Sequence, residues 1–303
     1  MAADAIPRDN DFHPDLRKTA RFLPRTLATS GTLPVMRALE SLAFRGRKDV
    51  EALTLTSGGH VRLHRPPGDV GPTPAMLWIH GGGLVAGNPQ QGDQACGQFS
   101  RTLGITVAAP SYRRAPEHPY PAALQDLYAA LEWLVSLPSV DSQRVAIGGE
   151  SAGGGLAAAL AFMVRDRGEI SPVLQLLSYP MLDDRTVSNP AVARNYRLVN
   201  ERSNRFGWAS YLGGADPDVA VPARRTDLAG LPAAWIGVGT VDLFYEEDVA
   251  YAERLRGASI PCHLEVVQGA FHGFDHIHAR AQVSRAYFDS QCEALRTALK
   301  GSG

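Results

Sequence analysis

The sequence predicts an α/β fold, with a mostly parallel twisted sheet, helices on both of its faces and a helical cap. From about residue 50 onward, short apolar segments rich in β-branched residues alternate with longer segments of helical periodicity. This alternation is typical of a parallel sheet that helices cover on both sides. A chain of 303 residues, 45% of them hydrophobic, is also large enough for one α/β domain with an insertion.

Eight segments have the patterns of strands. Residues 51–56 and 60–65 alternate polar with apolar side chains on either side of two glycines, which predicts a hairpin. The other six segments are rich in apolar residues, and residues 75–79 are continuously apolar, as expected for a strand buried on both faces. The six segments are residues 75–79, 105–109, 144–148, 173–178, 233–238 and 261–267.

Helical segments separate these strands. Residues 121–137 place their leucines on one face, and Pro121 suits the first turn of a helix. Residues 93–103 end at Gly104, which favours a left-handed helix cap. The remaining predicted helices are residues 154–164, 249–256 and 283–300.

Two segments break the alternation and predict the cap. Residues 1–46 join short helical patterns with prolines, and residues 183–228 are polar and rich in arginine. We expect these two segments to form a helical cap over a core domain built from residues 47–182 and 229–303.

Composition argues against several classes of function. A formal net charge of −1 gives no basis for binding nucleic acid or an anionic membrane. No apolar stretch is long enough to span a bilayer, and the acidic N-terminus lacks the apolar region of a signal peptide. The three cysteines lack metal-ligand spacing and are expected to be free thiols in a reducing compartment, so we expect a cytoplasmic protein.

A candidate nucleophile lies at the centre of the chain. Ser151 follows a predicted buried strand and precedes a predicted buried helix, within the sequence Gly-Glu-Ser-Ala-Gly of residues 149–153. A serine at the apex of a strand–turn–helix unit is the context of a nucleophile elbow, where small neighbours tolerate the sharp turn. The motif alone is weak, because a chain so rich in glycine and serine produces it by chance in roughly one case in six.

Two further residues complete a candidate catalytic triad in the chain order Ser, Asp, His that this fold uses. His272 follows the last predicted strand and is the candidate general base. The competing His276 and His278 are expected to begin the next helix. Asp242 follows another strand and is the candidate carboxylate, although it also suits the N-cap of the helix after it. Glu247 lies within the first turns of that helix, where it suits the helix dipole.

An oxyanion hole is the third expected part. Three glycines follow His80 directly after a predicted strand and expose backbone amides that no side chain shields. We expect the amides of Gly82, Gly83 and Ala152 to hold the oxyanion. His80 is expected to bond the loop and not to take part in the chemistry.

These motifs together resemble the hormone-sensitive lipase family of α/β-hydrolases, also called bacterial family IV esterases. The resemblance spans about residues 50–295 and rests on HGGG at 80–83, YRRAPE at 112–117, GESAGG at 149–154, YPMLD at 179–183, DLAGLP at 227–232 and FHGF at 271–274. It implies the α/β-hydrolase fold, the triad and oxyanion residues given above, a two-part cap, no cofactor or metal, and frequent homodimerisation. Leu243, where proline is common, and Glu150, where aspartate or threonine is commoner, depart from the family pattern.

The expected function is hydrolysis of short- to medium-chain carboxylic esters, with a small-molecule ester as the partner. The residues leave open an amidase, a lactonase or a carbohydrate deacetylase on the same triad. A non-catalytic small-molecule receptor is the alternative from another class, because the family resembled includes a plant hormone receptor on this fold. That receptor lacks the catalytic histidine, whereas this chain has all three triad residues.

Substrate size is expected to follow from the cap. Its large aromatic side chains predict a closed pocket that favours acyl chains of roughly four to eight carbons, unless they only pack the cap onto the core. They are Phe12, Phe22, Phe44, Phe206, Trp208 and Tyr211.

Overall fold

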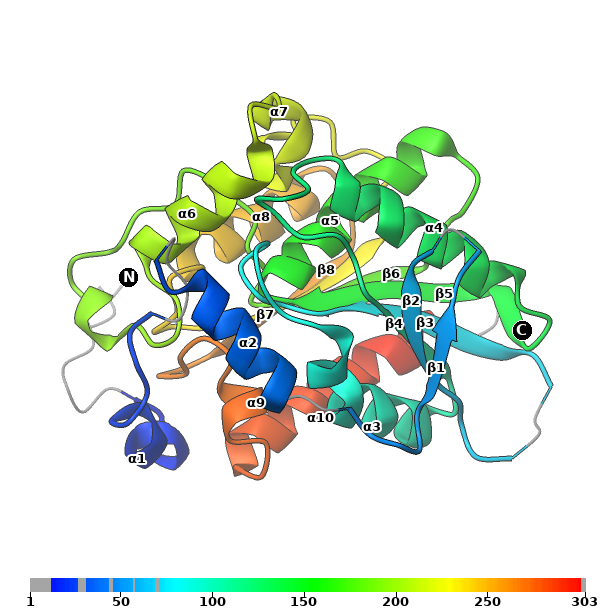
Figure 1. The fold of residues 1–303 in the computed structure, drawn as a ribbon, viewed down its shortest axis with the longest axis horizontal. Coiled ribbons are helices and arrows are strands. Elements are labelled where there is room, and N and C mark those ends of the chain that lie inside the picture. The colour runs from blue at the N-terminus through cyan, green and yellow to red at the C-terminus, as the bar shows by residue number, and fades with distance from the viewer. Residues whose placement is uncertain (1–11, 27–30, 44–45, 57, 69–70, 301–303) are drawn as a thin grey trace.

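The computed structural model describes residues 12–26, 31–43, 46–56, 58–68 and 71–300. Its centre is one eight-stranded sheet with the strand order β1-β2-β4-β3-β5-β6-β7-β8 (Figure 1). The strands are β1 Glu51–Thr54, β2 His60–His64, β3 Thr73–Ile79, β4 Thr106–Pro110, β5 Val140–Glu150, β6 Leu174–Ser178, β7 Ala233–Gly239 and β8 Cys262–Val267. The predicted fold class is confirmed, and every predicted strand forms within a few residues of its expected bounds.

The sheet is antiparallel at one edge and parallel elsewhere. Strands β1 and β2 form the predicted hairpin, and β2 also pairs with β4 in antiparallel register. From β4 through β3 to β8 every pairing is parallel, so the carboxyl ends of these strands meet at one edge. That edge is where an open α/β sheet binds its ligands.

Two helical layers cover the sheet and bury two hydrophobic clusters. Helices α4, α5 and α8 pack on one face, and α3 and α10 pack on the other (Figure 1). Their bounds are α3 Asp93–Leu103, α4 Ala122–Ser136, α5 Ala152–Arg167, α8 Tyr245–Gly257 and α10 Gln282–Ala298. Helix α3 ends at Gly104, with φ of 67°, as the sequence predicts.

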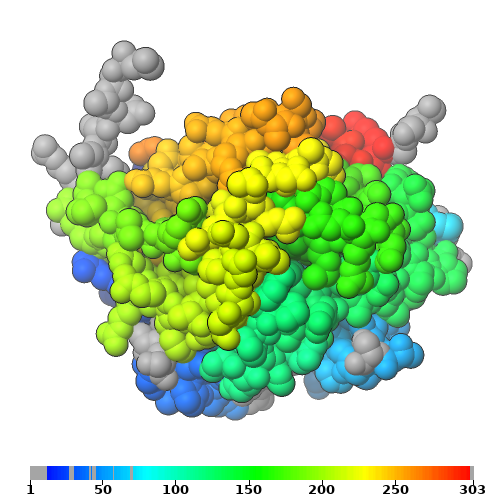
Figure 2. All heavy atoms as spheres, turned by 90° about the horizontal axis from the view of Figure 1, so that it is seen from above, coloured from blue at the N-terminus to red at the C-terminus, as the bar shows by residue number. Residues whose placement is uncertain are grey.

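The two segments outside the alternation contain short helices. The first holds η1 Pro14–Leu16, α1 Arg17–Ala20 and α2 Leu33–Ala43, and the second holds η3 Ala193–Asn195, α6 Glu201–Leu212, α7 Pro217–Ala220 and η4 Pro222–Arg224. Residues 183–228, coloured from yellow-green to yellow, extend across one face of the molecule (Figure 2).

Residues 12–20 pack in a different hydrophobic cluster from α2, whose Leu33 belongs to the cluster of α4, α5 and α8. Phe12, Leu16 and Ala20 are buried in the same cluster as α3 and α10, and the rings of Phe12 and Phe271 lie 6.2 Å apart. Two further short helices, η2 Pro89–Gly92 and α9 Phe274–Ile277, lie near the carboxyl edge of the sheet. None of the helices in the described ranges has both the length and the apolar character that crossing a bilayer requires.

Candidate active site

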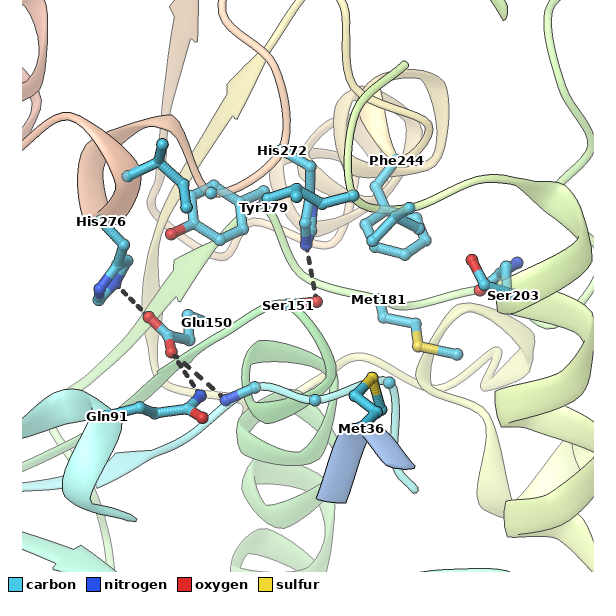
Figure 3. A pocket seen from close by; sticks show the side chains of 18 of the residues that line it. Met36, Gln91, Glu150, Ser151, Tyr179, Met181, Ser203, Phe244, His272 and His276 are labelled. Carbon is cyan, nitrogen blue, oxygen red and sulfur yellow. Dashed lines mark hydrogen bonds and ion pairs between the residues drawn. The ribbon is translucent and has the colours of Figure 1, made fainter. Parts of the chain in front are cut away.

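The expected site residues meet at the carboxyl edge of the parallel strands. Ser151 directly follows β5, and Asp242 and His272 lie in the loops after β7 and β8. All three are buried, with at most 8% of each residue exposed. The sheet topology therefore brings together three residues that are far apart in the sequence. Figure 3 shows two of them, Ser151 and His272.

Ser151 occupies a strained turn. Its φ of 54° and ψ of −123° lie in a region that L-residues rarely adopt. A Cβ at Gly153 would lie 2.1 Å from the carbonyl oxygen of Ile79, so only glycine fits beside the turn. The Ser151 amide donates to the Ser178 carbonyl, and the Ser151 carbonyl accepts from Met181, each at 2.9 Å. Both neighbours hold the turn in the geometry of a nucleophile elbow.

A hydrogen-bonded chain joins the three side chains. The Oγ of Ser151 lies 2.8 Å from Nε2 of His272, and Nδ1 of His272 lies 2.8 Å from Oδ2 of Asp242. In the neutral imidazole one nitrogen accepts and the other donates, so this chain suits a proton passing from Ser151 to His272. The edges of the aromatic rings of Tyr179 and Phe244 pack against His272, at centroid distances of 4.8 and 5.2 Å.

Asp242 faces His272, as expected for the candidate carboxylate, but it is not the N-cap of α8, which is Phe244. Its Oδ2 faces His272, and its Oδ1 accepts a hydrogen bond from the Phe244 amide at 3.0 Å, just before α8 begins. The backbone bond fixes the carboxylate orientation, which in turn orients the histidine ring.

Two of the three expected oxyanion donors, Gly82 and Gly83, line the cavity over Ser151. No described acceptor takes a hydrogen bond from either amide. Ala152 is the first residue of α5, where a helix leaves its amides without an internal partner. Gly82 has φ of +125°, and a Cβ there would lie 2.2 Å from the Ala86 oxygen. The tight loop therefore requires glycine at this position.

His80 is positioned to support this loop. Its ring stacks on Tyr112 at 4.3 Å, and its Nδ1 donates to the Gly81 carbonyl at 2.8 Å. Burial lowers the pKa of the His80 imidazole to about 4, so the ring is neutral at physiological pH. The Tyr112 hydroxyl donates to the His80 carbonyl at 3.0 Å, which ties the family motif at 112–117 to the same loop.

His276 lies in the next helix, as the sequence predicts, whereas His278 is the C-cap of that helix, the four-residue α9. His276 forms an ion pair with Glu150, the residue before Ser151 (Figure 3). Partial loss of solvent favours the uncharged form of each partner, although 30% of the His276 side chain remains exposed, and their mutual attraction outweighs this effect. The pKa of the His276 imidazole rises to about 10, and that of the Glu150 carboxyl falls to about 2.

Glu150 also reaches the loop that carries the expected oxyanion donors Gly82 and Gly83. Its Oε1 accepts from Gln91 Nε2 at 3.1 Å and from the Gly81 amide at 3.5 Å. Glu150 and His276 are functional candidates that sequence reasoning missed. The departure from the family pattern at Glu150 was the one available signal.

Glu247 is also more than a residue that complements the helix dipole. It lies buried in the first turn of α8, and its Oε1 accepts from the amides of Leu182 and Asp183 at 2.6 and 3.3 Å. The Thr186 hydroxyl donates to its Oε2. Burial raises the pKa of the Glu247 carboxyl well above its usual range, against the effect of these hydrogen bonds. Glu247 thus holds the start of the 183–228 segment.

The cavity over Ser151 has a volume of about 200 Å³. It is not walled by the aromatic residues that the sequence suggested. Among the described ones, none of Phe12, Phe22, Phe206, Trp208 and Tyr211 lines it, and Phe44 lies outside the described residues. Phe22 is exposed, whereas Trp208 and Tyr211 are buried in the core cluster. The aromatic side chains that line the cavity are Tyr179 and Phe244, from the core.

Titratable side chains do not form a metal site in the described ranges, since no three histidine, cysteine, aspartate or glutamate residues converge there. The geometry instead suits acyl transfer by an activated hydroxyl.

Comparisons with known proteins agree with this geometry. The α/β-hydrolase fold family matches residues 76–276. The esterase LipI of Mycobacterium tuberculosis is 34% identical over 223 residues, covering 70% of each chain. The ethyl acetate hydrolase of Pseudomonas putida is 31% identical over 293 residues, covering 87% of this chain and 92% of that protein. Among solved structures, a bacterial heroin esterase superposes with a TM-score of 0.87 at 32% identity, covering 96% of this chain and 99% of that one.

Proposed function

Because the chain belongs to the hormone-sensitive lipase family of α/β-hydrolases, we propose that it is a carboxylesterase for short- to medium-chain esters. The observation that carries this proposal is the pair of 2.8 Å contacts that link Ser151 to His272 and His272 to Asp242. The names of relatives that act on esters, the ethyl acetate hydrolase among them, support the substrate class.

In the proposed mechanism Ser151 is the nucleophile. Its Oγ attacks the ester carbonyl carbon while His272 Nε2 takes the hydroxyl proton, and Asp242 stabilises the resulting imidazolium. The amides of Gly82, Gly83 and Ala152 donate to the oxyanion. When the tetrahedral intermediate collapses, the C–O bond to the alcohol breaks and His272 returns the proton to the leaving oxygen. Water then attacks the acyl-enzyme by the same route and releases the acid.

Labelling and mutation test the proposal together. A serine-reactive phosphonate should modify Ser151, and Ser151→Ala should lose about 10⁴- to 10⁶-fold in kcat while keeping its fold. A wild-type protein that hydrolyses no ester and takes up no phosphonate would instead support the non-catalytic receptor. A panel of esters, amides and lactones separates the esterase from the other hydrolases on this triad.

We further propose a cytoplasmic homodimer. The three cysteines, Cys96, Cys262 and Cys292, are free, which is consistent with a reducing compartment. Dimerisation is supported by the family resemblance, and analytical ultracentrifugation of the purified protein tests it.

A further inference from the structure

Helix α6 carries one polar side chain that the proposed chemistry does not use. Asn204 is 2% exposed and lines the cavity that contains Ser151. Neither its Oδ1 nor its Nδ2 has a hydrogen-bond partner among the described residues. The neighbouring Ser203 also lines the cavity, but its hydroxyl donates to the Asn200 carbonyl and accepts from the Asn200 amide. A buried amide without partners destabilises the folded protein.

The position of Asn204 relates it to the reacting carbonyl. Gly207, three residues further along α6, presses on the oxyanion loop so closely that a Cβ there would lie 2.5 Å from the Gly83 oxygen. Residues three apart in a helix share a face, so Asn204 lies on the side of α6 that faces this loop. Three residues of α-helix rise about 4.5 Å, so we expect a group bound by Asn204 to lie roughly three to five bonds from an ester carbonyl held at this loop.

The surroundings strengthen any hydrogen bond made there. Among the residues that line the cavity with Asn204, four have no nitrogen or oxygen in their side chains: Met181, Leu198, Val199 and Phe244. In such apolar surroundings a hydrogen bond is electrostatically stronger than in water. Two other polar groups on α6, Trp208 Nε1 and Tyr211 Oη, also lack partners in the described part of the chain, but neither residue lines the cavity.

We propose that Asn204 determines substrate specificity by binding a neutral hydrogen-bonding group, such as a ketone, hydroxyl or amide, on the arm of the ester that extends toward α6. This inference rests on the proposed esterase function and names its substrate class: esters with a second polar group about three to five bonds from the scissile carbonyl. Hydrocarbon esters of the same shape leave the carboxamide unpaired and react more slowly.

Two matched substrate pairs test the inference in each arm of the ester. The acyl pair is p-nitrophenyl 4-oxopentanoate and 4-methylpentanoate, and the alcohol pair is acetonyl acetate and isobutyl acetate. Asn204→Leu keeps the number and branching of the side-chain heavy atoms but removes both polar atoms. In one pair it should lower the ratio of kcat/KM for the ketone to that for the hydrocarbon by about tenfold. Comparing ratios between proteins cancels the intrinsic reactivity of each ester.

The thermal midpoint gives a second readout that a structural role would not produce. Asn204→Leu should raise Tm while it lowers the preference for the ketone, because it removes an unpaired buried amide. Tyr211→Phe is the matched control: it deletes an unpartnered polar atom outside the cavity and should leave both ratios unchanged within about twofold.

The outcomes separate this inference from the proposed function. Hydrolysis of none of the four esters by the wild type would contradict the esterase itself. If the wild type hydrolyses them but Asn204→Leu and Asn204→Ala keep both ratios, the esterase stands and the role of Asn204 is overturned.

Discussion

Glu150 and His276 form an ion pair beside the nucleophile, joining the end of β5 to the short helix α9. The same carboxylate accepts hydrogen bonds from Gln91 and from the Gly81 amide, at the start of the oxyanion loop. One residue thereby ties together the strand that carries Ser151, the loop after β3 and the helix after His272. The pair is well placed to hold the proposed oxyanion donors in position relative to Ser151.

The pH dependence of stability should reveal this pair. The pKa of His276 is raised from 6.5 to about 10. Its contribution to the stability of the fold is therefore full below pH 6.5 and is lost as pH rises through 10. The pKa of Glu150 is lowered from 4.5 to about 2. Its contribution to the stability of the fold is therefore full above pH 4.5 and is lost as pH falls through 2. Urea unfolding should show the wild type more stable than Glu150→Gln at pH 6, with a margin that narrows toward pH 10. A margin independent of pH in that range would contradict the pair.

Substitution of two buried carboxylates should separate a catalytic role from a structural one. Asp242→Asn should lower kcat by about 10⁴-fold, because the amide favours the wrong tautomer of His272. Glu247→Gln should keep kcat within about tenfold, since Glu247 contacts Leu182, Asp183 and Thr186 and not His272. Steady-state kinetics at pH 7 distinguishes the two variants. If Asp242→Asn keeps its full kcat, Asp242 is not the carboxylate of the triad.

The oxyanion loop should not tolerate a side chain at Gly82. A Cβ there would lie 2.2 Å from the Ala86 oxygen, so Gly82→Ala must displace the loop and should cost about 10²-fold or more in kcat. Gly168→Ala is the control, because Gly168 also has positive φ, +70°, but no atom lies within 4 Å of its Cβ position. The control should lose stability in a thermal melt and keep its kcat; equal activity of both variants would remove Gly82 from the oxyanion hole.

Acyl-chain preference should follow cavity size. A cavity of about 200 Å³ is smaller than the 300–1,000 Å³ or so of pockets for drug-sized ligands. Each methylene that fits the cavity contributes about 0.8 kcal/mol of favourable burial free energy. A methylene that does not fit must displace packed atoms, which weakens binding. We expect kcat/KM for p-nitrophenyl esters to be greatest at roughly four to eight carbons. A maximum at twelve carbons or longer would show that the cavity opens in solution.

Local patterns were sufficient for most of the fold. Strands and helices bury their side chains with different periods, so segments such as 105–109 and 121–137 were recognisable one at a time. The expected bounds of these elements were less accurate. Strand β5 begins at Val140 and not at residue 144, and helix α5 begins at Ala152 and not at residue 154. Helix α6 was not recognisable within the polar segment 183–228, because the side chains of that segment have the pattern of a surface that covers several elements.

The sequence by itself determined the sheet and the residues after its strands, Ser151, Asp242 and His272, because the carboxyl ends of parallel strands must meet at one edge. Only the tertiary structure decided what surrounds them. Three features depend on how distant segments pack: the contact of His276 with Glu150, the lack of a partner for Asn204 among the described residues, and the aromatic rings that reach the cavity. The reason is physical: periodicity reports that a side chain is buried, whereas the group it is buried against is chosen by the packing of the whole chain.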